Sequence, residues 1–499
     1  MLANLRFSIP LPSHLPMRRV IAAAFVLLVL QLLSGTELIF AQLIFLFVVL
    51  AGLTANLLGG IRTLPGFCLT MIALKLVLVS QVAKVVFWEA ADHNLKQPRT
   101  TAAVLVLGLT SVLMAALVIA RLKTRRVLFQ GKVNLDYLQR ASWIAFIIFL
   151  IASPGYLLVG TGDGYVQIGG IAGLMKRLIP CGGIAVVAGT AHAILASDGK
   201  RCLSGLNLRP LLVMFLFGMY GASKEGMISP FMYFGLTAAA FRFRLGSTHL
   251  LALLGFALFL NFVLFPFGQV ARNQIRGYGF AGTVTEIGSF SSEYLTSLKG
   301  FRSLYRRSHE GLEDSNMNVY FDRPIDVLER MSLIKPCDSL VDATLELGES
   351  RWETIMPAFE SLLPASIFWR PYKNSSNYLG IKSGMISEDN EGTSISFGFI
   401  ADSFSSFRWL GTALIPFALC LLLFGVTQCL TGPMEQNIWW AYFCGLYFHQ
   451  VAEYNISGIF TLATYQNLWY LVPALLVHCT AVLSAQARLL RPGFSPAHD

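Results

Sequence analysis

The amino-acid sequence predicts an all-α integral membrane protein with about twelve transmembrane helices and one large, partly helical loop on the outer face. Three observations predict this fold class. Of 499 residues, 55% are hydrophobic and 13% are charged, which is about half the charged share of a soluble domain. The apolar residues gather in runs suited to a hydrocarbon core of about 30 Å. The basic residues lie in short segments between these runs, as in cytoplasmic loops of membrane proteins.

Twelve apolar runs are candidate spans. A helix of roughly 20 residues crosses the hydrocarbon core, and shorter helices suffice where neighbours or local thinning help. The seventh and eighth runs are short, so we expect the turn between them, which carries Lys224 and Glu225, to lie below the outer surface. Alternatively, these two residues neutralise each other in an ordinary turn. The runs are Val20–Leu33, Leu38–Leu58, Phe67–Trp88, Ala102–Ala120, Ala141–Val159, Leu178–Leu195, Leu211–Tyr220, Met227–Phe241, Leu250–Phe267, Trp409–Leu430, Ile438–Val451 and Leu468–Leu483.

The distribution of charge predicts the orientation of the chain. The net charge is +10, yet residues 268–408 hold 14 basic and 18 acidic residues, which leaves 24 basic and 10 acidic residues elsewhere. This pattern is typical of a membrane protein with basic cytoplasmic loops and not of a nucleic-acid-binding protein. It places both termini in the cytoplasm, with Lys96 and Arg99 as the chief exceptions. The expected parts are residues 1–267 with nine helices, the outer, periplasmic loop 268–408, and residues 409–499 with three helices and a short tail.

The outer loop is too long to be a simple connection, so we expect it to fold. Only Cys337 of the eight cysteines lies in it, so it has no internal disulfide, and no spacing in the chain suggests a metal. Residues Pro324–Leu363 show helical spacing, whereas Asn374–Gly392 is rich in Ser, Asn and Gly and is expected to be flexible. Residues Ser396–Phe407 are amphipathic, which favours a helix along the membrane surface.

Several ionisable side chains fall within the predicted spans, where such residues are functional candidates. Lys84 is expected to extend outward to the interface, whereas Lys75 lies nearer the middle of its span. His449 and Glu453 are four residues apart and share a helix face. This pair is either a proton relay or a buried hydrogen-bonded contact, or Glu453 lies at the outer end of the helix.

Five short patterns follow one another along the second half of the chain. The first is a span end with small residues and a basic residue (GASKEGMISP, Gly221–Pro230), and the second has an arginine just after the helix that enters the loop (FGQVARNQIRG, Phe267–Gly277). The third is an arginine-bearing helix (DRPIDVLERM, Asp322–Met331). The fourth has Pro and Trp before a Pro-x-Lys (GESRWETIMPAFESLLPASIFWRPYK, Gly348–Lys373), and the fifth is an acidic, aromatic stretch before the next span (TSISFGFIADSFSSFRWLG, Thr393–Gly411). With the helix count and the late loop, this order resembles the bacterial oligosaccharide repeat-unit polymerases, the Wzy-type enzymes. Ala365 and Asp402 depart from that family, which often has arginine and glutamate there.

The resemblance implies a glycosyltransferase of the bacterial inner membrane that polymerises oligosaccharide units carried on undecaprenyl pyrophosphate into O-antigen, capsule or exopolysaccharide. Arginine suits pyrophosphate because its planar fork donates two parallel bonds and keeps its charge. Fixed cations can stabilise the leaving group in place of a metal, so no cofactor is expected. The expected partners are the lipid-linked oligosaccharide, membrane lipid and, by family analogy, a chain-length regulator.

The candidate residues follow from these requirements. Arg272 and Arg276 are assigned to the pyrophosphate, with Lys224 beneath them and Arg330 above, while Asp402 and Glu349 are candidates for the general base. The structural alternative is that the arginines contact lipid phosphates or nearby carboxylates. The candidate catalytic residues are Arg272, Arg276, Arg330, Asp402 and Glu349, and the candidate substrate-binding residues are Lys224, Arg351, Arg370, Lys373 and Trp369.

Two other functions stay open from the sequence. A transporter or flippase for lipid-linked oligosaccharide fits twelve spans and intramembrane charges, but no clear internal repeat relates two halves of the chain, as it does in many transporters. An O-antigen ligase would perform the same chemistry on another acceptor.

Overall fold

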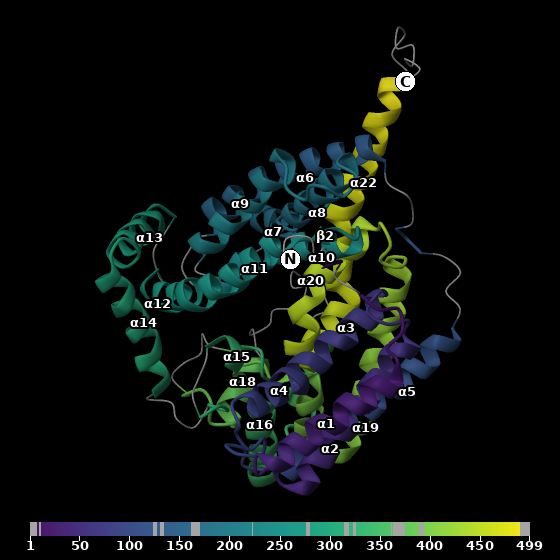
Figure 1. The fold of residues 1–499 in the computed structure, drawn as a ribbon, viewed down its shortest axis with the longest axis vertical. Helices are drawn as coiled ribbons and strands as arrows, with labels where there is room; N and C mark the ends of the chain where they lie inside the picture. The colour runs from purple at the N-terminus through teal and green to yellow at the C-terminus, as the bar shows by residue number, and fades with distance from the viewer. Residues whose placement is uncertain are drawn as a thin grey trace.

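The computed structural model describes residues 7–8, 11–122, 127–129, 134–160, 170–221, 223–275, 280–313, 319–322, 326–360, 362, 375–388 and 394–489. These residues are mostly helical (Figure 1), and the two-residue strands β1 (Phe7–Ser8) and β2 (Arg244–Leu245) pair antiparallel. The helices are α1 (Met17–Leu33), α2 (Leu38–Leu57), α3 (Leu64–Ala73), η2 (Leu74–Leu78), α4 (Val79–Val86), α5 (Pro98–Arg121), α6 (Leu135–Gly160), α7 (Gly170–Leu178), α8 (Cys181–Ala196), α9 (Gly205–Tyr220), α10 (Lys224–Ala240), α11 (Ser247–Phe259), η3 (Leu260–Leu264), α12 (Phe265–Ile275), α13 (Phe280–Leu295), α14 (Leu298–Glu313), α15 (Asp326–Arg330), α16 (Ile334–Leu347), η5 (Arg351–Glu353), α17 (Met356–Glu360), α18 (Ser375–Lys382), α19 (Gly398–Leu430), α20 (Ile438–Glu453), α21 (Ile456–Thr461), η6 (Leu462–Gln466) and α22 (Asn467–Leu489).

Eight helices within the described residues are long and apolar enough to cross a membrane. Four other predicted spans coincide with α1, α9, α10 and α20, which have 16 or 17 residues each. At 1.5 Å per residue these helices are about 24–26 Å long, shorter than a typical hydrocarbon core. The helical membrane-protein class is therefore supported, while the total of about twelve spans stays a prediction. The eight are Leu38–Leu57, Leu64–Val86, Pro98–Arg121, Leu135–Tyr156, Ile171–Ala196, Ser247–Ala271, Gly398–Leu430 and Ile456–Ser484.

Helix α20 lies in the middle of the bundle (Figure 1) and carries three of the largest fully buried side chains among the described residues. Trp440, Tyr442 and Tyr447 are 0% exposed. Next to this centre, α5 packs against α19 at Gly108, where a Cβ atom would collide with the Ile400 side chain. A small residue at this position lets the two backbones approach closely, as is common where membrane helices pack.

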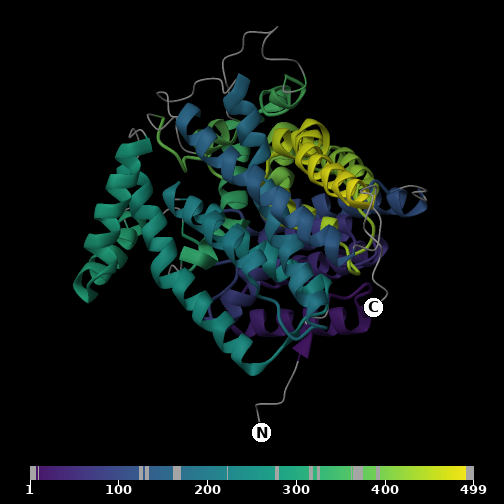
Figure 2. The same cartoon turned by 90° about the horizontal axis from the view of Figure 1, so that it is seen from above.

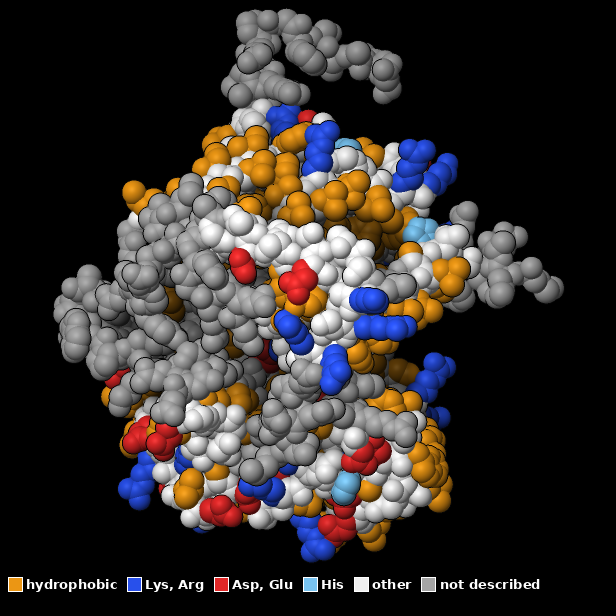
Figure 3. Space-filling model, turned by 90° about the vertical axis from the view of Figure 1, so that its left-hand side faces the viewer, with side chains coloured by type: hydrophobic (Ala, Val, Ile, Leu, Met, Phe, Trp, Pro, Cys, Tyr) orange, Lys and Arg blue, Asp and Glu red, His pale blue; other side chains and the backbone are white. Residues whose placement is uncertain are grey.

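The connections predicted to be cytoplasmic meet at one end of the bundle. Arg62, after α2, forms an ion pair with Glu435, before α20, at 2.9 Å. Leu128, after α5, donates its backbone N–H to the Cys429 carbonyl at the end of α19. On the face shown in Figure 3, Lys and Arg predominate among the charged side chains at the upper end, whereas both signs occur at the lower end. Which end faces the cytoplasm stays a prediction from the charge pattern.

At the opposite end, the two exceptions to the charge pattern each lie beside an acid. The Lys96 ammonium is 2.8 Å from the Asp342 carboxylate, and the Arg99 guanidinium forms an ion pair with Glu37. Local pairing with acids therefore reduces the net positive charge at this end, although both basic side chains are more than half exposed.

A buried carboxylate attaches the outer-loop helix α16 to the start of α5. Asp338 accepts hydrogen bonds from the backbone N–H groups of Lys96 and Gln97, at 2.6 and 2.9 Å, and from the Thr101 hydroxyl at 2.9 Å. A carboxylate suits a helix N-terminus because the first N–H groups have no partner within the helix. Burial nevertheless raises the pKa of Asp338 above its usual value.

Lys84 does not extend to the interface as predicted. Its side chain is 0% exposed, its ammonium is 2.7 Å from the Glu89 carboxylate, and it lies 4.7 Å from the centre of the Tyr320 ring. The prediction was wrong because residues 319–322 of the outer loop cover this end of α4, which sequence spacing does not reveal.

The predicted loop, residues 268–408, divides into two structural parts. Helices α13 and α14 stand apart from the rest of the molecule in both Figure 1 and Figure 2, and share a small core with α12 that contains Phe267, Phe290, Tyr294 and Leu304. Helices α15 and α16 instead pack against α4, α5 and α19, while α18 packs against α16 and α17 against α21. The membrane helices also cross the predicted loop boundaries, since α12 continues to Ile275 and α19 begins at Gly398.

The expectation that Ser396–Phe407 lies along the membrane surface was wrong. Residues 398–406 form the first part of α19 and are all buried within the protein. Their hydroxyls form internal hydrogen bonds, such as that between Ser405 and Ser350 at 2.9 Å, so the polar face does not need water. The helix then bends at Phe407 and Arg408, whose backbone angles are not helical.

We expect Asp338→Ala to lower the free energy of unfolding by about 3 kcal/mol, because two partly buried N–H groups and one buried hydroxyl would lose their acceptor. The measurement is the thermal unfolding midpoint of the purified protein in detergent. Asp136→Ala removes a half-exposed carboxylate that pairs with Arg140 within α6, and should cost less than about 1 kcal/mol. Equal midpoints for the two variants would contradict the anchoring role of Asp338.

Candidate functional site

Lys224 is a buried cation at the start of α10. The Ser223 hydroxyl accepts the Gly226 N–H at 3.0 Å and caps this helix, as serine commonly does. Lys224 is 5% exposed, and its ammonium donates to the Gln269 side-chain oxygen on α12 at 3.0 Å. This contact brings a positive charge to the helix that contains Arg272, three residues after Gln269.

The next residue, Glu225, contacts a histidine on α20. The Glu225 carboxylate oxygen Oε2 lies 3.1 Å from His449 Nε2. The Glu225 side chain is 54% exposed and His449 is 14% exposed, so the carboxylate faces open space and the imidazole lies behind it. Within the described residues, His449 Nδ1 is buried and has no hydrogen-bond partner.

A second ion pair lies one helical turn along α20. The Lys75 ammonium contacts the Glu453 carboxylate, with side-chain exposures of 7% and 28%. His449 and Glu453 pair with different partners, which disfavours the alternative of a contact between them. Glu453 is the last residue of α20, in keeping with the alternative that places it at the end of the helix. We call Lys75, Lys224, Glu225, His449 and Glu453 the His449 cluster.

Lys75 belongs to the π-helix η2, an interruption of the third predicted span. π-Turns within α-helices are frequent at functional sites. The Lys75 carbonyl accepts the N–H of Leu333, from the outer loop, at 2.9 Å. A segment of the predicted outer loop therefore contacts the helix that carries Lys75.

The helix that carries His449 and Glu453 is broken directly after Glu453. Asn455 caps the following helix α21, and its side-chain oxygen accepts the Gly458 N–H at 2.8 Å. The Ile456 N–H donates to Asp402 at 2.8 Å. Asp402 is 0% exposed, so this candidate base has a clear structural contact: it satisfies a donor at the start of α21.

A second group of charged side chains gathers near Asp402. Lys382 donates to the Gly348 carbonyl at 2.7 Å and to the Ser350 hydroxyl at 2.6 Å. Burial lowers the pKa of the Lys382 ammonium, while the carboxylates of Glu353, Asp402 and Glu349 act in the opposite direction. Both candidate bases predicted from the sequence, Glu349 and Asp402, therefore act to raise the pKa of the same lysine, Lys382. We call Glu349, Arg351, Lys382, Asp402 and Arg408 the Lys382 cluster.

Two arginines of this cluster approach the same carboxylate. Arg351 and Arg408 place their Nε atoms 3.9 and 3.8 Å from the Glu349 carboxylate. Both have a φ angle of 47°, in the left-handed region that residues other than glycine rarely adopt. Such strain is found preferentially at functional sites.

The other predicted site residues are only partly described. Arg330 is exposed on α15, which packs against α4. Arg272 lies in α12, but its side chain is outside the described residues, as are Arg276, Trp369, Arg370 and Lys373 entirely. Lys382 was missed because it lies in the stretch predicted to be flexible, residues Asn374–Gly392. Residues Ser375–Lys382 instead form helix α18, and the signal available was a single lysine in a run of small polar residues.

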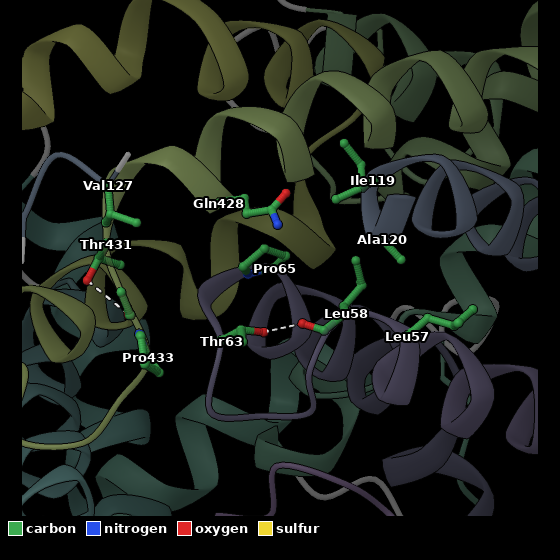
Figure 4. Close-up of a pocket in the computed structure, with 11 residues that line it drawn as sticks. Leu57, Leu58, Thr63, Pro65, Ile119, Ala120, Val127, Gln428, Thr431 and Pro433 are labelled. Carbon is green, nitrogen blue, oxygen red and sulfur yellow. Dashed lines mark hydrogen bonds between the residues drawn. The ribbon is translucent and has the colours of Figure 1, made fainter. Parts of the chain in front are cut away.

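A pocket of about 190 Å³ lies elsewhere, at the end with the Arg62–Glu435 pair (Figure 4). It is lined mainly by apolar residues such as Pro65, Ile119 and Pro433. Its lining contains no charged residue, which makes it unsuited to a pyrophosphate.

Comparison with protein-family models, with curated proteins and with solved structures returned no match. Among the described residues, no group of three or more His, Cys, Asp or Glu side chains is placed to hold a metal ion. The function must therefore be inferred from the chemistry of the two clusters. The His449 cluster offers a buried cation beside a half-exposed carboxylate, a combination suited to binding an anion and moving a proton.

We expect Lys75→Met to lower the free energy of unfolding by roughly 3 kcal/mol, because it leaves Glu453 as a partly buried charge without its partner. The double variant Lys75→Met/Glu453→Gln should regain most of this loss, since both charges are removed. The thermal unfolding midpoint in detergent measures both effects.

Arg62→Met, which breaks the more exposed Arg62–Glu435 pair, is the control and should change stability by less than about 1 kcal/mol. A double variant no more stable than Lys75→Met would show that the pair is not the source of the loss.

Proposed function

We propose that this protein is a membrane glycosyltransferase that polymerises oligosaccharide repeat units carried on undecaprenyl pyrophosphate, at the outer face of the bacterial inner membrane. One observation carries the proposal beyond the sequence resemblance. Lys224 is buried against α12, the helix that leads to Arg272 and Arg276, while the adjacent Glu225 is half-exposed beside His449. A cation for the leaving group thus lies next to a carboxylate within a helical bundle.

The cation has a direct role in this chemistry. Negative charge grows on the pyrophosphate as the sugar is transferred, and a fixed ammonium or guanidinium group stabilises it. Lys224 supplies one such charge, and we assign the same role to Arg272 and Arg276. Arg330 is proposed to contact the pyrophosphate from the other side. Arg351, Arg370, Lys373 and Trp369 are proposed to bind the rest of the lipid-linked oligosaccharide.

The neighbouring helix is suited to lateral entry of a lipid. No residue of α11 is buried, and Leu251 and Leu254 are 68% and 58% exposed. Helix α11 continues through η3 into α12, which contacts Lys224. A polyprenyl chain that moves along this apolar face would bring its pyrophosphate towards the buried ammonium.

A transporter of lipid-linked oligosaccharide is the second candidate. The break between α20 and α21 and the Lys75–Glu453 pair favour it, because many transporters bind substrates and ions at interrupted helices. An O-antigen ligase is a further alternative with the same chemistry and another acceptor.

The proposal is tested by deleting the gene and separating the surface glycan by size on a gel. Polymerase function predicts a single repeat unit on the acceptor, and restoration of long chains by the wild-type gene. Lys224→Met should reduce the polymer by roughly 10- to 100-fold, as expected for loss of one hydrogen bond to a charged group. Lys200→Met, an exposed lysine in the α8–α9 connection, is the matched control and should restore the wild-type pattern.

Other results would overturn the proposal. Long polymer that stays on the lipid carrier indicates a ligase. Accumulation of lipid-linked units on the cytoplasmic side indicates a transporter. Membrane levels of each variant, measured by immunoblot, separate loss of function from loss of protein.

A further inference from the structure

Glu225 and His449 form a pair whose geometry is held by the packing of three helices. Helices α9 and α10 meet at Gly218 and Gly226, where a Cβ atom on Gly218 would collide with the Gly226 backbone. This close approach and the Ser223 cap fix the first turn of α10, which carries Glu225. His449 extends from α20 to meet it at 3.1 Å.

The carboxylates of the two clusters differ in their partners. Glu453 contacts the Lys75 ammonium, and Glu349 lies between two guanidinium groups, those of Arg351 and Arg408. These two carboxylates are therefore already in contact with basic side chains of the protein.

Asp402 differs from them by its burial. It is 0% exposed and accepts the Ile456 N–H, so a sugar hydroxyl has no open path to it in this structure. Glu225 has an imidazole as its partner and exposes 54% of its side chain. It therefore combines access with the ability to share a proton with a neighbouring group.

Given the proposed function, on which this inference rests, we infer that Glu225 is the general base for the acceptor hydroxyl and that His449 is its positioning residue. The hydroxyl oxygen forms a bond to the anomeric carbon of the donor sugar, and the bond from that carbon to the pyrophosphate oxygen breaks. The electron pair of that bond leaves with the pyrophosphate. The hydroxyl proton passes to the Glu225 carboxylate oxygen that does not contact His449, while His449 Nε2–H donates to Oε2 throughout and holds the carboxylate in place.

The test uses the full-length protein in liposomes with the undecaprenyl-pyrophosphate-linked oligosaccharide as donor and acceptor. Glu225→Gln should lower kcat by 100-fold or more, the usual contribution of a general base, with KM for the lipid-linked substrate within about two-fold of wild type. His449→Gln should lower kcat about 10-fold with the same KM. Glu435→Gln and His14→Gln, at the opposite end of the bundle, are the matched controls and should keep wild-type kcat.

Chemical rescue separates a base from a structural carboxylate. Glu225→Ala should regain at least 10-fold in kcat when formate is added, because formate supplies a carboxylate in the space left by the side chain. The same formate concentration should leave Glu435→Ala unchanged.

Each contrary result has one meaning. If the wild-type protein extends chains and Glu225→Gln keeps its kcat, the base assignment is wrong while the polymerase stands. An increase in KM alone would assign Glu225 to binding, and absence of formate rescue in a folded Glu225→Ala variant would exclude it as the base. If the wild-type protein moves the lipid-linked units across the bilayer without joining them, the proposed function fails and the base assignment fails with it.

Discussion

The contact between the Lys75 ammonium and the Glu453 carboxylate is the interaction on which the centre of the molecule depends. Lys75 lies within the third predicted span, where an unpaired charge is costly, and Glu453 lies just beyond the eleventh, Ile438–Val451. Their side chains are 7% and 28% exposed. The same lysine belongs to the π-helix η2 and accepts the Leu333 N–H through its carbonyl. Lys75 therefore connects the third predicted span to α20 through its side chain and to the predicted outer loop through its backbone carbonyl. These contacts explain how a segment of the loop packs against the helical bundle.

The break after Glu453 connects the two charged clusters, because Asp402 of the Lys382 cluster accepts the N–H of Ile456, which follows Glu453 closely in the chain. On one side of it, α20 carries His449 and Glu453, and on the other α21 begins with its N–H groups bound by Asn455 and Asp402. In a bilayer, backbone groups need partners within the protein, so a broken helix requires such caps. The structural need for Asp402 here and the exposure of Glu225 give these two acids different roles. Asp402 supports the break, whereas Glu225 exposes 54% of its side chain.

Much of the fold follows from the sequence, but less of the candidate site does. All twelve apolar runs are helical in the described residues, because a long apolar run has few other stable arrangements in lipid. The sequence also indicated Lys224 and Glu225 as residues of a short turn, and placed His449 and Glu453 on one helix face. The sequence did not indicate the partners of Glu225 and Glu453, because these partners lie on other helices. Lys382 was not identified from the sequence, because its hydrogen-bond partners, Gly348 and Ser350, are distant in the chain.

The sequence by itself determined the helical membrane class, the alternation of apolar runs with basic connections, and the set of ionisable residues within the spans. These properties depend on local composition and on the cost of placing polar groups in lipid. Only the tertiary structure decided which charges pair, that residues 398–406 turn inward, and that Lys84 is covered by residues 319–322. Each of these depends on contacts between segments far apart in the chain. A periodic pattern indicates which side of a helix is apolar or polar, but it does not indicate which segment packs against that side.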